Sequence, residues 1–371
     1  MRSSALICVL FIVLASAQSW EIAQPGYRYE FPRDHFSHPG YETEWWYYTG
    51  NLHAPHGHRY GFELTFFRQA QKLNAALIAS EPPVWRPDQI YLAHLALSDI
   101  DGHRFYHQER LHRAGPGLAG AALSDQRYWN GNWQVRWTAL PRADQELMAV
   151  CERFTIELHL KSAKPPVIQG QDGISRKGPQ PAEASHYISF TRLTASGTLK
   201  LGTTSEPVNG TAWMDHEFFS EPPASDLTGW DWFAIQLNTN EELMLYRLRD
   251  AHGRISPYSS GSYVDPQGRA RFLAGSDFAL VPQETWHSAQ SGATYPVTWQ
   301  IRVPSLGLLL NETTDLKDQE LREPDSASPT YWEGAVNYRG TSQGKPITGV
   351  GYLEMTGYAQ PVKLSGLSPQ K

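Results

Sequence analysis

The sequence predicts an all-β protein of two domains, and three observations support this prediction. Beyond an apolar N-terminal stretch, the 371 residues contain no long segment with the 3.6-residue periodicity of a helix. Short runs of alternating apolar and polar residues recur along the chain, as expected for strands with one buried face. A faint internal repeat divides the chain into two similar halves. Many short strands separated by turns are typical of β-barrels and β-sandwiches.

The first residues predict a secretory signal peptide. Arg2 supplies a short positive region, an apolar run covers residues 5–14, and residues 15–17 (Ala-Ser-Ala) have the small-x-small pattern of a cleavage site. The apolar run is too short to span a bilayer permanently. An uncleaved anchor is the alternative. We expect residues 1–17 to be removed and the mature chain to be exported, either to the periplasm or to the medium.

Composition narrows the function classes. The net charge is −6 and no Lys/Arg cluster is present, so we expect no nucleic-acid partner. Removal of the signal leaves Cys151 as the single cysteine, which we expect to be an inert buried thiol. The chain has 13 Trp, 18 Tyr and 14 Phe against 19% charged residues. This balance suits either thick sandwich cores or barrels whose cavities are lined with rings.

Alternation predicts the individual strands. In residues 154–160 the apolar side chains fall at every second position, so His159 is expected to point outward and not to act as a ligand. Turn sequences separate the predicted strands at residues 54–57, 101–102, 238–240 and 265–268. Further strands are predicted at residues 44–52, 59–68, 90–100, 187–193, 230–237, 242–249, 298–303 and 349–358.

The internal repeat sets the domain count. A Trp-rich strand, a turn and an aromatic strand ending in Arg occur at residues 44–68 and again at residues 230–249. Residues 209–215 resemble residues 348–354, and each of these segments places an acid two residues after an aromatic. The Pro-containing segment 221–226 has the composition of a linker. We therefore expect an N-terminal domain over residues 18–222 and a C-terminal domain over residues 223–371.

Ionisable side chains interrupt otherwise apolar strands in four places. Burying an unpaired charge costs several kcal/mol, so these groups need partners or a wet cavity. The same surroundings shift pKa values enough for acid–base catalysis. They can therefore form a site at a cavity mouth or domain interface, or a buried structural network that holds the domains together. The four places are Glu44 with Trp45, Trp46 and Tyr47, His94, the run Trp213-Met-Asp215-His216-Glu217, and Asp231 between Trp230 and Trp232.

Strand geometry limits how these groups combine. On a regular strand Asp215 and Glu217 share one face, about 7 Å apart, while His216 points the other way. His216 and Glu217 lack the H-E-x-x-H spacing, and most other histidines fall in predicted loops, so no metal site is expected. The sequence contains no G-x-S-x-G elbow and no Walker or dinucleotide loop. We expect no cofactor.

Several motifs resemble the AttH/CrtC-like family of exported bacterial proteins, which includes relatives of carotenoid 1,2-hydratase (hydroxyneurosporene synthase). The similarity is carried by residues 44–51, 60–68, 213–217, 331–334 and 351–358, in order across nearly the whole mature chain. It implies two tandem lipocalin-like antiparallel β-barrels with a shared ligand region. Relatives are often labelled secreted hydrolases, but no nucleophile for hydrolysis is visible here.

The resemblance also implies a chemistry. In the hydratase branch, water adds across a terminal isoprenoid double bond without a cofactor: an acid protonates the alkene, and an aromatic face stabilises the carbocation. That branch carries a His-x-Trp and a Tyr-x-Asp motif. This chain matches them as His216-Glu217-Phe218 and Tyr246-Arg247-Leu248, so Leu248 stands where those hydratases carry an acid.

Two functional hypotheses follow. The first is a cofactor-free hydratase or isomerase, a lyase of the carotenoid 1,2-hydratase type, acting on an apolar isoprenoid or lipid-like molecule. The second is a non-catalytic periplasmic carrier that releases its lipid unchanged. We favour the first because a carrier rarely needs several acids in its cavity wall. Either protein could also associate peripherally with a membrane or an export system.

The candidate residues are divided by role. The candidate catalytic residues are Asp215, His216, Glu217, Asp231 and Tyr246. The ligand-binding candidates are rings that would form the wall of the cavity and polar groups expected beside these rings. The candidate ligand-binding residues are Glu44, Trp45, Trp46, Arg68, His94, Trp213, Trp230 and Trp232.

Overall fold

The computed structural model describes residues 20–71, 85, 87–140, 143–220, 226–323 and 328–362. The predicted signal peptide and residues 221–225 of the predicted linker lie outside the described residues. Within them the protein is built from β-strands, and its short 3₁₀ helices include η1 (Arg33–His35), η2 (Pro55–Gly57) and η4 (Pro304–Leu306). No helix of this part is long and apolar enough to cross a membrane. The all-β prediction is confirmed.

The first sheet is a nearly closed barrel. Its order is β4-β3-β2-β1-β13-β12-β9-β8-β7-β6-β5, with β10 and β11 paired to β12. Aromatic and aliphatic side chains such as Trp46, Trp137 and Phe190 fill its interior. The strands are β1 (Thr43–His53), β2 (Arg59–Ala70), β3 (Gln89–Asp99), β4 (Arg104–Arg113), β5 (Ala119–Ala122), β6 (Arg127–Asn130), β7 (Trp133–Ala139), β8 (Asp144–Val150), β9 (Phe154–Ser162), β10 (Val167–Ile168), β11 (Ser175–Arg176), β12 (Ala184–Leu201) and β13 (Thr204–Phe219).

The second sheet curves into a half-barrel with its own apolar core, which includes Phe233, Trp299 and Trp332. Its order is β17-β16-β15-β14-β25-β24-β22-β21-β18, with β23 paired to β24. A separate hairpin joins β19 (Thr285–His287) to β20 (Thr294–Pro296). The strands of the sheet are β14 (Leu227–Leu237), β15 (Glu242–Asp250), β16 (Ser260–Val264), β17 (Ala270–Ala274), β18 (Ala279–Pro282), β21 (Thr298–Val303), β22 (Leu308–Thr313), β23 (Glu320–Leu321), β24 (Tyr331–Ser342) and β25 (Lys345–Met355).

The strand pairing reproduces the internal repeat. In the first sheet β1 pairs with β2 and with β13, and in the second sheet β14 pairs with β15 and with β25. The opening strand of each half therefore lies between its hairpin partner and the closing strand. Asp215 on β13 is opposite Tyr47, and Glu354 on β25 is opposite Trp232. The two acids that follow the repeated aromatics thus occupy equivalent places in the two sheets.

Two sequence expectations differ from the structure. The predicted strand over residues 187–193 is part of the much longer β12, whose second half pairs with β9 and β13 through backbone hydrogen bonds. Backbone pairing does not depend on an apolar face, so alternation misses such extensions. Cys151 was expected to be buried but is half-buried, with its Sγ 3.3 Å from the carbonyl oxygen of Phe154. The expected outward position of His159 is confirmed, with its side chain 66% exposed.

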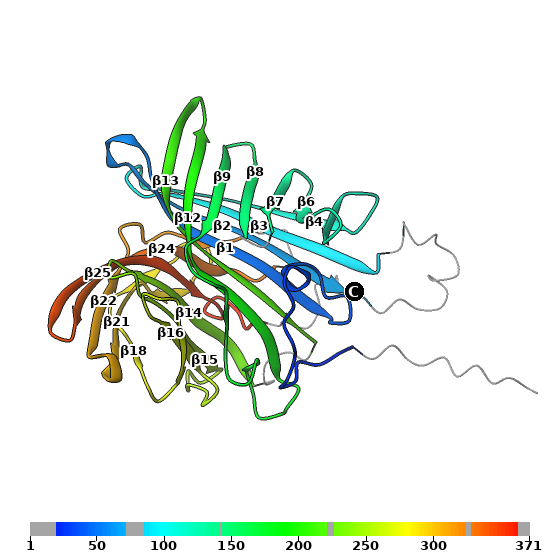
Figure 1. Cartoon of the computed structure of the whole chain (residues 1–371). Helices are drawn as coiled ribbons and strands as arrows, with labels where there is room; N and C mark the ends of the chain where they lie inside the picture. Colours follow the sequence, from blue (N-terminus) through cyan, green and yellow to red (C-terminus); the bar gives the residue numbers. More distant parts are fainter. Residues whose placement is uncertain are drawn as a thin grey trace, which may run out of the picture.

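The two sheets meet where β1 packs against β25, β2 against β24 and β12 against β14 (Figure 1). Gly61 allows the close approach of β2 to β24, because a Cβ there would lie 2.6 Å from the Cβ of Ala335. Hydrogen bonds cross the interface: the Asn51 amide donates to the carbonyl of Gly351 (3.0 Å), and the Gln236 amide donates to that of Thr191 (2.8 Å). The two sheets therefore approach closely at these points, and both amide side chains find acceptors across the interface.

Candidate functional site

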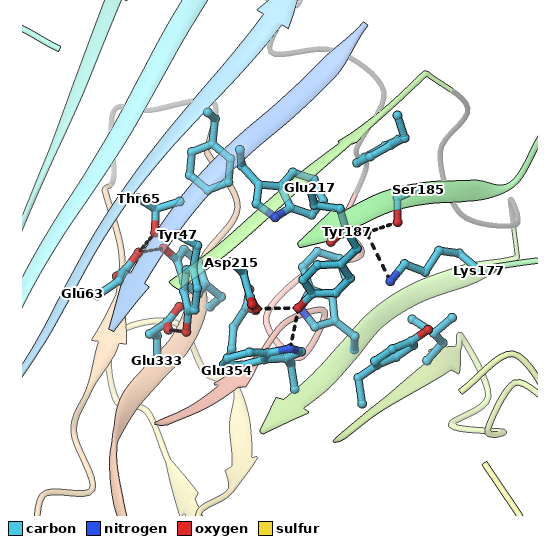
Figure 2. A pocket seen from close by; sticks show the side chains of 18 of the residues that line it. Tyr47, Glu63, Thr65, Lys177, Ser185, Tyr187, Asp215, Glu217, Glu333 and Glu354 are labelled. Carbon is cyan, nitrogen blue, oxygen red and sulfur yellow. Dashed lines mark hydrogen bonds and ion pairs between the residues drawn. The ribbon is translucent and has the colours of Figure 1, made fainter. Parts of the chain in front are cut away.

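A cavity lies between the two sheets, on the faces that point away from the two apolar cores (Figure 2). The volume of this cavity is about 110 Å³. The alternation of the strands selects the residues that line it. Trp45 and Tyr47 on β1 face the cavity, whereas Trp46 between them packs in the core of the first barrel.

Aromatic rings from both domains form most of the wall. The rings of Tyr47 and Trp232 meet edge to face across the interface, with centroids 5.2 Å apart. Trp232 also packs edge to face against Trp213, at 6.0 Å. Such packing fixes the orientation of the rings in the cavity wall. The aromatic residues that line the cavity are Trp45, Tyr47, Phe67, Tyr187, Phe219, Trp230, Trp232, Tyr246 and Tyr331.

Five carboxyl groups also line this cavity, namely Glu63, Asp215, Glu217, Glu333 and Glu354. Burial raises the pKa of Asp215 to about 7 and that of Glu354 to about 8. Burial also raises the pKa values of Glu63 and Glu333, and the neighbouring carboxyl charges add to the effect at Glu333. Removing a carboxylate from water disfavours its charged form. Near neutral pH the cavity therefore holds carboxylic acids that can donate protons.

Asp215 is held by three donors. The Tyr187 hydroxyl (2.5 Å), the Ser189 hydroxyl (2.5 Å) and the Trp213 indole N–H (2.8 Å) donate to its carboxyl oxygens. Tyr187 in turn accepts a hydrogen bond from the Trp232 indole at 3.1 Å, so the chain of contacts crosses from one domain to the other. These bonds oppose the effect of burial on the pKa of Asp215 and fix the orientation of the carboxyl group.

Glu217 has a charged partner. Lys177, which follows β11, places its Nζ 3.3 Å from Oε1 of Glu217, and the Ser185 hydroxyl donates to the same oxygen (Figure 2). Burial alone would lower the pKa of Lys177, but the charges of Glu217 and Tyr246 raise it. The ammonium also lies 4.3 Å from the ring centroid of Tyr246. Lys177 and Ser185 therefore fix the carboxyl group of Glu217 in the cavity wall.

The opposite part of the cavity joins acids from the two domains. The Tyr47 hydroxyl of β1 donates to Glu333 of β24, and the Thr65 hydroxyl donates to Oε1 of Glu63 at 2.7 Å. Tyr331 donates to the same Glu63 oxygen at 3.3 Å. The second carboxyl oxygen of Glu63, Oε2, has no hydrogen-bond partner among the described residues. One buried polar atom thus stays free for a ligand.

Glu44, Arg68 and His216 lie on the other face of the same strands and form a buried network. Oε2 of Glu44 is 2.9 Å from Nε of Arg68, and Oε1 is 2.8 Å from Nε2 of His216. His38 approaches the same Oε1 at 2.7 Å. Although burial would raise it, the charges of Arg68 and His38 hold the pKa of Glu44 well below its usual range. Trp46 stacks on His216, with centroids 4.9 Å apart.

This network has the residue types of a metal site. One ligand atom from each of His38, Glu44 and His216 lies within 4.8 Å of the others. However, the histidine nitrogens that face Glu44 already bond to its carboxylate, and Arg68 forms an ion pair with that group. A cation would have to displace these bonds and would face the guanidinium of Arg68. The donor set therefore fits a structural ion-pair network better than a metal centre.

Asp231 is also placed away from the cavity. It lies between Trp230 and Trp232, which line the cavity, so its own side chain points to the opposite face of β14. There it pairs with Arg247 (2.5 Å) and Arg249 (3.0 Å) and accepts a hydrogen bond from Tyr358 (2.9 Å). Two guanidinium partners hold it as a paired carboxylate without a route to the cavity.

The AttH-like family model matches residues 22–358. The chain belongs to the AttH-like family. It is 33% identical to an AttH-family protein from Nitrosomonas europaea of known crystal structure, with a TM-score of 0.81 over 91% of this chain and 99% of that one. The predicted family resemblance is confirmed. No protein of curated function matches this chain.

More distant likenesses show the shared fold of this AttH-like protein. Kievitone hydratase from Nectria haematococca has a TM-score of 0.65 at 14% identity, over 87% of this chain and 90% of that one. The structure named CghA has a TM-score of 0.50 at 13% identity, over 86% of this chain and 90% of that one. A hydratase is therefore among the proteins with this two-domain β architecture.

The cavity of the AttH-like protein collects some of the residues predicted from sequence. Trp45, Asp215, Glu217, Trp230, Trp232 and Tyr246 line it. Two others stand one contact behind it: Trp213 donates to Asp215, and His94 bonds to the Tyr331 hydroxyl at 2.6 Å. Leu248 also lines the cavity, so the position where the hydratase branch carries an acid does face it. The predicted residues that the structure places elsewhere are Glu44, Trp46, Arg68, His216 and Asp231.

Sequence reasoning did not select several residues of the site. The signal for Glu354 was available, because the repeat aligns it with Asp215. Glu63 and Glu333 each interrupt an apolar or aromatic strand, as Glu44 does, and the same criterion would have selected them. Lys177 comes from an irregular segment without a strand pattern, and no local signal marks it. The unselected lining residues with polar side chains are Tyr47, Glu63, Thr65, Lys177, Ser185, Tyr187, Tyr331, Glu333 and Glu354.

Proposed function

We propose that this AttH-like protein is an exported, cofactor-free hydratase or isomerase that acts on an apolar isoprenoid or lipid-like molecule in the interdomain cavity. The observation that carries the proposal is a buried carboxyl group, Asp215, whose pKa is raised to about 7 within an aromatic wall. A general acid works best when its pKa lies near the operating pH. Aromatic faces stabilise a neighbouring positive charge.

The proposed reaction uses two acids of β13. The carboxyl of Asp215 gives its proton to one carbon of a double bond, and the other carbon becomes cationic beside the rings of Tyr47 and Trp232. Water then forms a C–O bond at that carbon and passes a proton to the carboxylate of Glu217. Proton exchange with solvent in the cavity returns Asp215 to its acid form and Glu217 to its base form. Dehydration is the same sequence reversed.

The fold adds support of a coarser kind. Kievitone hydratase, by its name a hydratase, shares the two-domain architecture. Fold alone does not determine activity, so the argument depends on the acids and rings of this chain. We place Lys177 as the residue that orients Glu217 and Tyr187 as the one that orients Asp215.

The test is turnover of isoprenoid and lipid substrates by residues 18–371, with products identified by mass spectrometry. A product that has gained one water is expected. Asp215→Asn should lower the rate by about 10²–10⁴-fold, the usual contribution of a general acid. Glu157→Gln, an exposed acid on β9 of the same sheet, is the matched control and should keep the wild-type rate. Equal rates for Asp215→Asn and wild type would exclude Asp215 as the acid.

A lipid carrier is the second candidate, and Leu248 is the observation that favours it. It lines the cavity at the position where the hydratase branch carries an acid. A carrier would return its ligand unchanged, from wild type and from Asp215→Asn alike. Loss of ligand from a variant of the aromatic wall, such as Trp232→Leu, without any chemical change in the ligand would favour transport.

A further inference from the structure

We propose that the interdomain cavity selects a compact cation with an apolar surface, of the quaternary ammonium or protonated amine class. The inference goes beyond the proposed reaction and does not depend on it. The same selectivity would also favour the tertiary carbocation of that reaction, so two sources share this chemistry. Three features of the cavity support the proposal: the balance of its charged groups, an unpartnered carboxyl oxygen and the aromatic wall.

The cavity has an excess of acids over cations. Of its five carboxyl groups, only Glu217 forms an ion pair with a lysine or arginine among the described residues, and its partner is Lys177 at 3.3 Å. Asp215 and Glu333 accept hydrogen bonds from uncharged hydroxyl or indole donors. The pKa of Glu354 is raised mainly by its burial. A cationic ligand would supply the counter-charge that these groups lack.

A buried atom points to the same kind of ligand independently. Glu63 is 1% exposed and lines the cavity, yet its Oε2 has no hydrogen-bond partner among the described residues. Buried carboxyl oxygens are almost always partnered, because an unsatisfied one costs free energy. Thr65 and Tyr331 already occupy Oε1. A ligand that brings a positive charge to this corner would satisfy Oε2.

The aromatic wall suits a cation that lacks strong hydration. Tyr47 and Trp232 stand at 85° to each other, with centroids 5.2 Å apart, and both line the cavity together with acids of both domains. Ring faces attract cations by their quadrupole, and such cages of rings recognise quaternary ammonium groups. Neighbouring carboxylates add a Coulomb attraction that is strong in a site removed from water. Rings and acids together distinguish an apolar cation from a neutral molecule of the same shape.

Binding of such a cation should release protons. Burial raises the pKa values of Asp215 and Glu354 to about 7 and about 8, so both groups are partly protonated near neutral pH. A bound positive charge would lower these pKa values, and the protons would pass to the buffer. The number of protons released is a readout that neither folding nor catalysis supplies.

The experiment compares choline with its neutral isostere 3,3-dimethylbutan-1-ol by isothermal titration calorimetry on residues 18–371 at pH 7. Choline should bind at least about tenfold more tightly. Its binding enthalpy should also change with the ionisation enthalpy of the buffer, because protons are released. The double variant Glu63→Gln/Glu333→Gln should reduce the preference for choline to less than about threefold. Glu312→Gln, a buried acid in the core of the second sheet, is the control and should retain the preference.

Several results would overturn the inference: equal binding of the two compounds, tighter binding of the alcohol, no binding of either, or an undiminished preference in the double variant. A turnover assay in the presence of choline also distinguishes the two possible sources of this selectivity, the carbocation of the reaction and an ammonium ligand. Competitive inhibition of turnover by choline would assign the selectivity to the carbocation of the reaction. Choline binding by a protein that turns over none of its substrates would assign it to an ammonium ligand. The first result upholds both proposals, and the second upholds this one alone.

Discussion

Strands β1, β2 and β13 are neighbours in one sheet, and the two faces of this sheet hold their buried acids in opposite ways. On the face toward the N-terminal segment, Glu44 is paired with Arg68 at 2.9 Å and bonded to His216, and its pKa is lowered. On the cavity face, Asp215 has only uncharged donors, and burial raises its pKa to about 7. The two environments lie one residue apart on β13, since His216 follows Asp215.

The presence or absence of a cationic partner separates the structural acid Glu44 from the candidate functional acid Asp215. A buried acid with a guanidinium partner stays charged and holds elements together, whereas a buried acid without a cation can exchange a proton. Glu44 ties β1 to β2 and β13 through Arg68 and His216, so it acts as an ionic brace inside one domain. Asp215 faces residues of the other domain across a cavity. Partner chemistry therefore distinguishes the two roles where burial does not.

The largest expected effect is loss of the brace. Arg68→Met leaves Glu44 buried without its guanidinium, which should lower the free energy of unfolding by about 3–5 kcal/mol at pH 7. Urea unfolding measures this change. Arg254→Met removes an ion pair with Asp250 in which the arginine is 75% exposed, and its effect should be much smaller. Similar effects of the two variants would break the distinction between the brace and a surface pair.

The second effect concerns the cavity face and depends on pH. The folded pKa of Asp215 is raised from 3.8 to about 7, so the folded protein holds more protons than the unfolded chain between these values. Wild-type stability should therefore fall as pH rises from about 4 to about 7, and Asp215→Asn should lack this part of the fall. The variant should gain about 2–4 kcal/mol relative to wild type between pH 4 and pH 8.

Urea unfolding of both proteins across this pH range gives the difference. A constant difference between variant and wild type would mean that Asp215 is charged at all these pH values, as Glu44 is. The comparison between the two faces would then lose its basis.

The smallest effect tests an unpaired acid outside the cavity. Glu312 on β22 is 1% exposed in the core of the second sheet and has no charged or hydroxyl partner among the described residues. Burial raises its pKa well above the usual value, so it destabilises the fold as pH rises above about 4.5. Glu312→Gln should be neutral at pH 4 and should stabilise the protein by about 1–2 kcal/mol at pH 8.

Thermal or urea unfolding at the two pH values, with turnover measured in parallel, checks this expectation. Turnover should not change, because Glu312 does not line the cavity. A loss of turnover in Glu312→Gln would show that an unpaired acid need not face the interdomain cavity to serve the function.

Alternation and the internal repeat were enough to predict most strands and their order along the chain. Alternating side chains located the strands, and the predicted strand over residues 298–303 coincides with β21. The repeat predicted that each half opens with an aromatic hairpin and closes with an acid after an aromatic, and β1–β2, β13, β14–β15 and β25 have this arrangement. These features are local or periodic, and strand geometry converts them directly into structure.

Which acids share a site depends on how the two domains pack together, because the acids of the cavity come from both of them. The sequence placed Asp215 and Glu217 on one face of β13 and His216 on the other, but not which face meets a second domain. The packing of the two sheets brought Glu333 and Glu354 to the cavity of Asp215, whereas the pairing of β1 with β2 placed Arg68 beside Glu44. A carboxyl group becomes a proton donor or a fixed charge according to the cations within a few ångströms of it. The neighbours of Asp215 across the cavity come from β24 and β25, far from β13 in the sequence, and no local pattern records them.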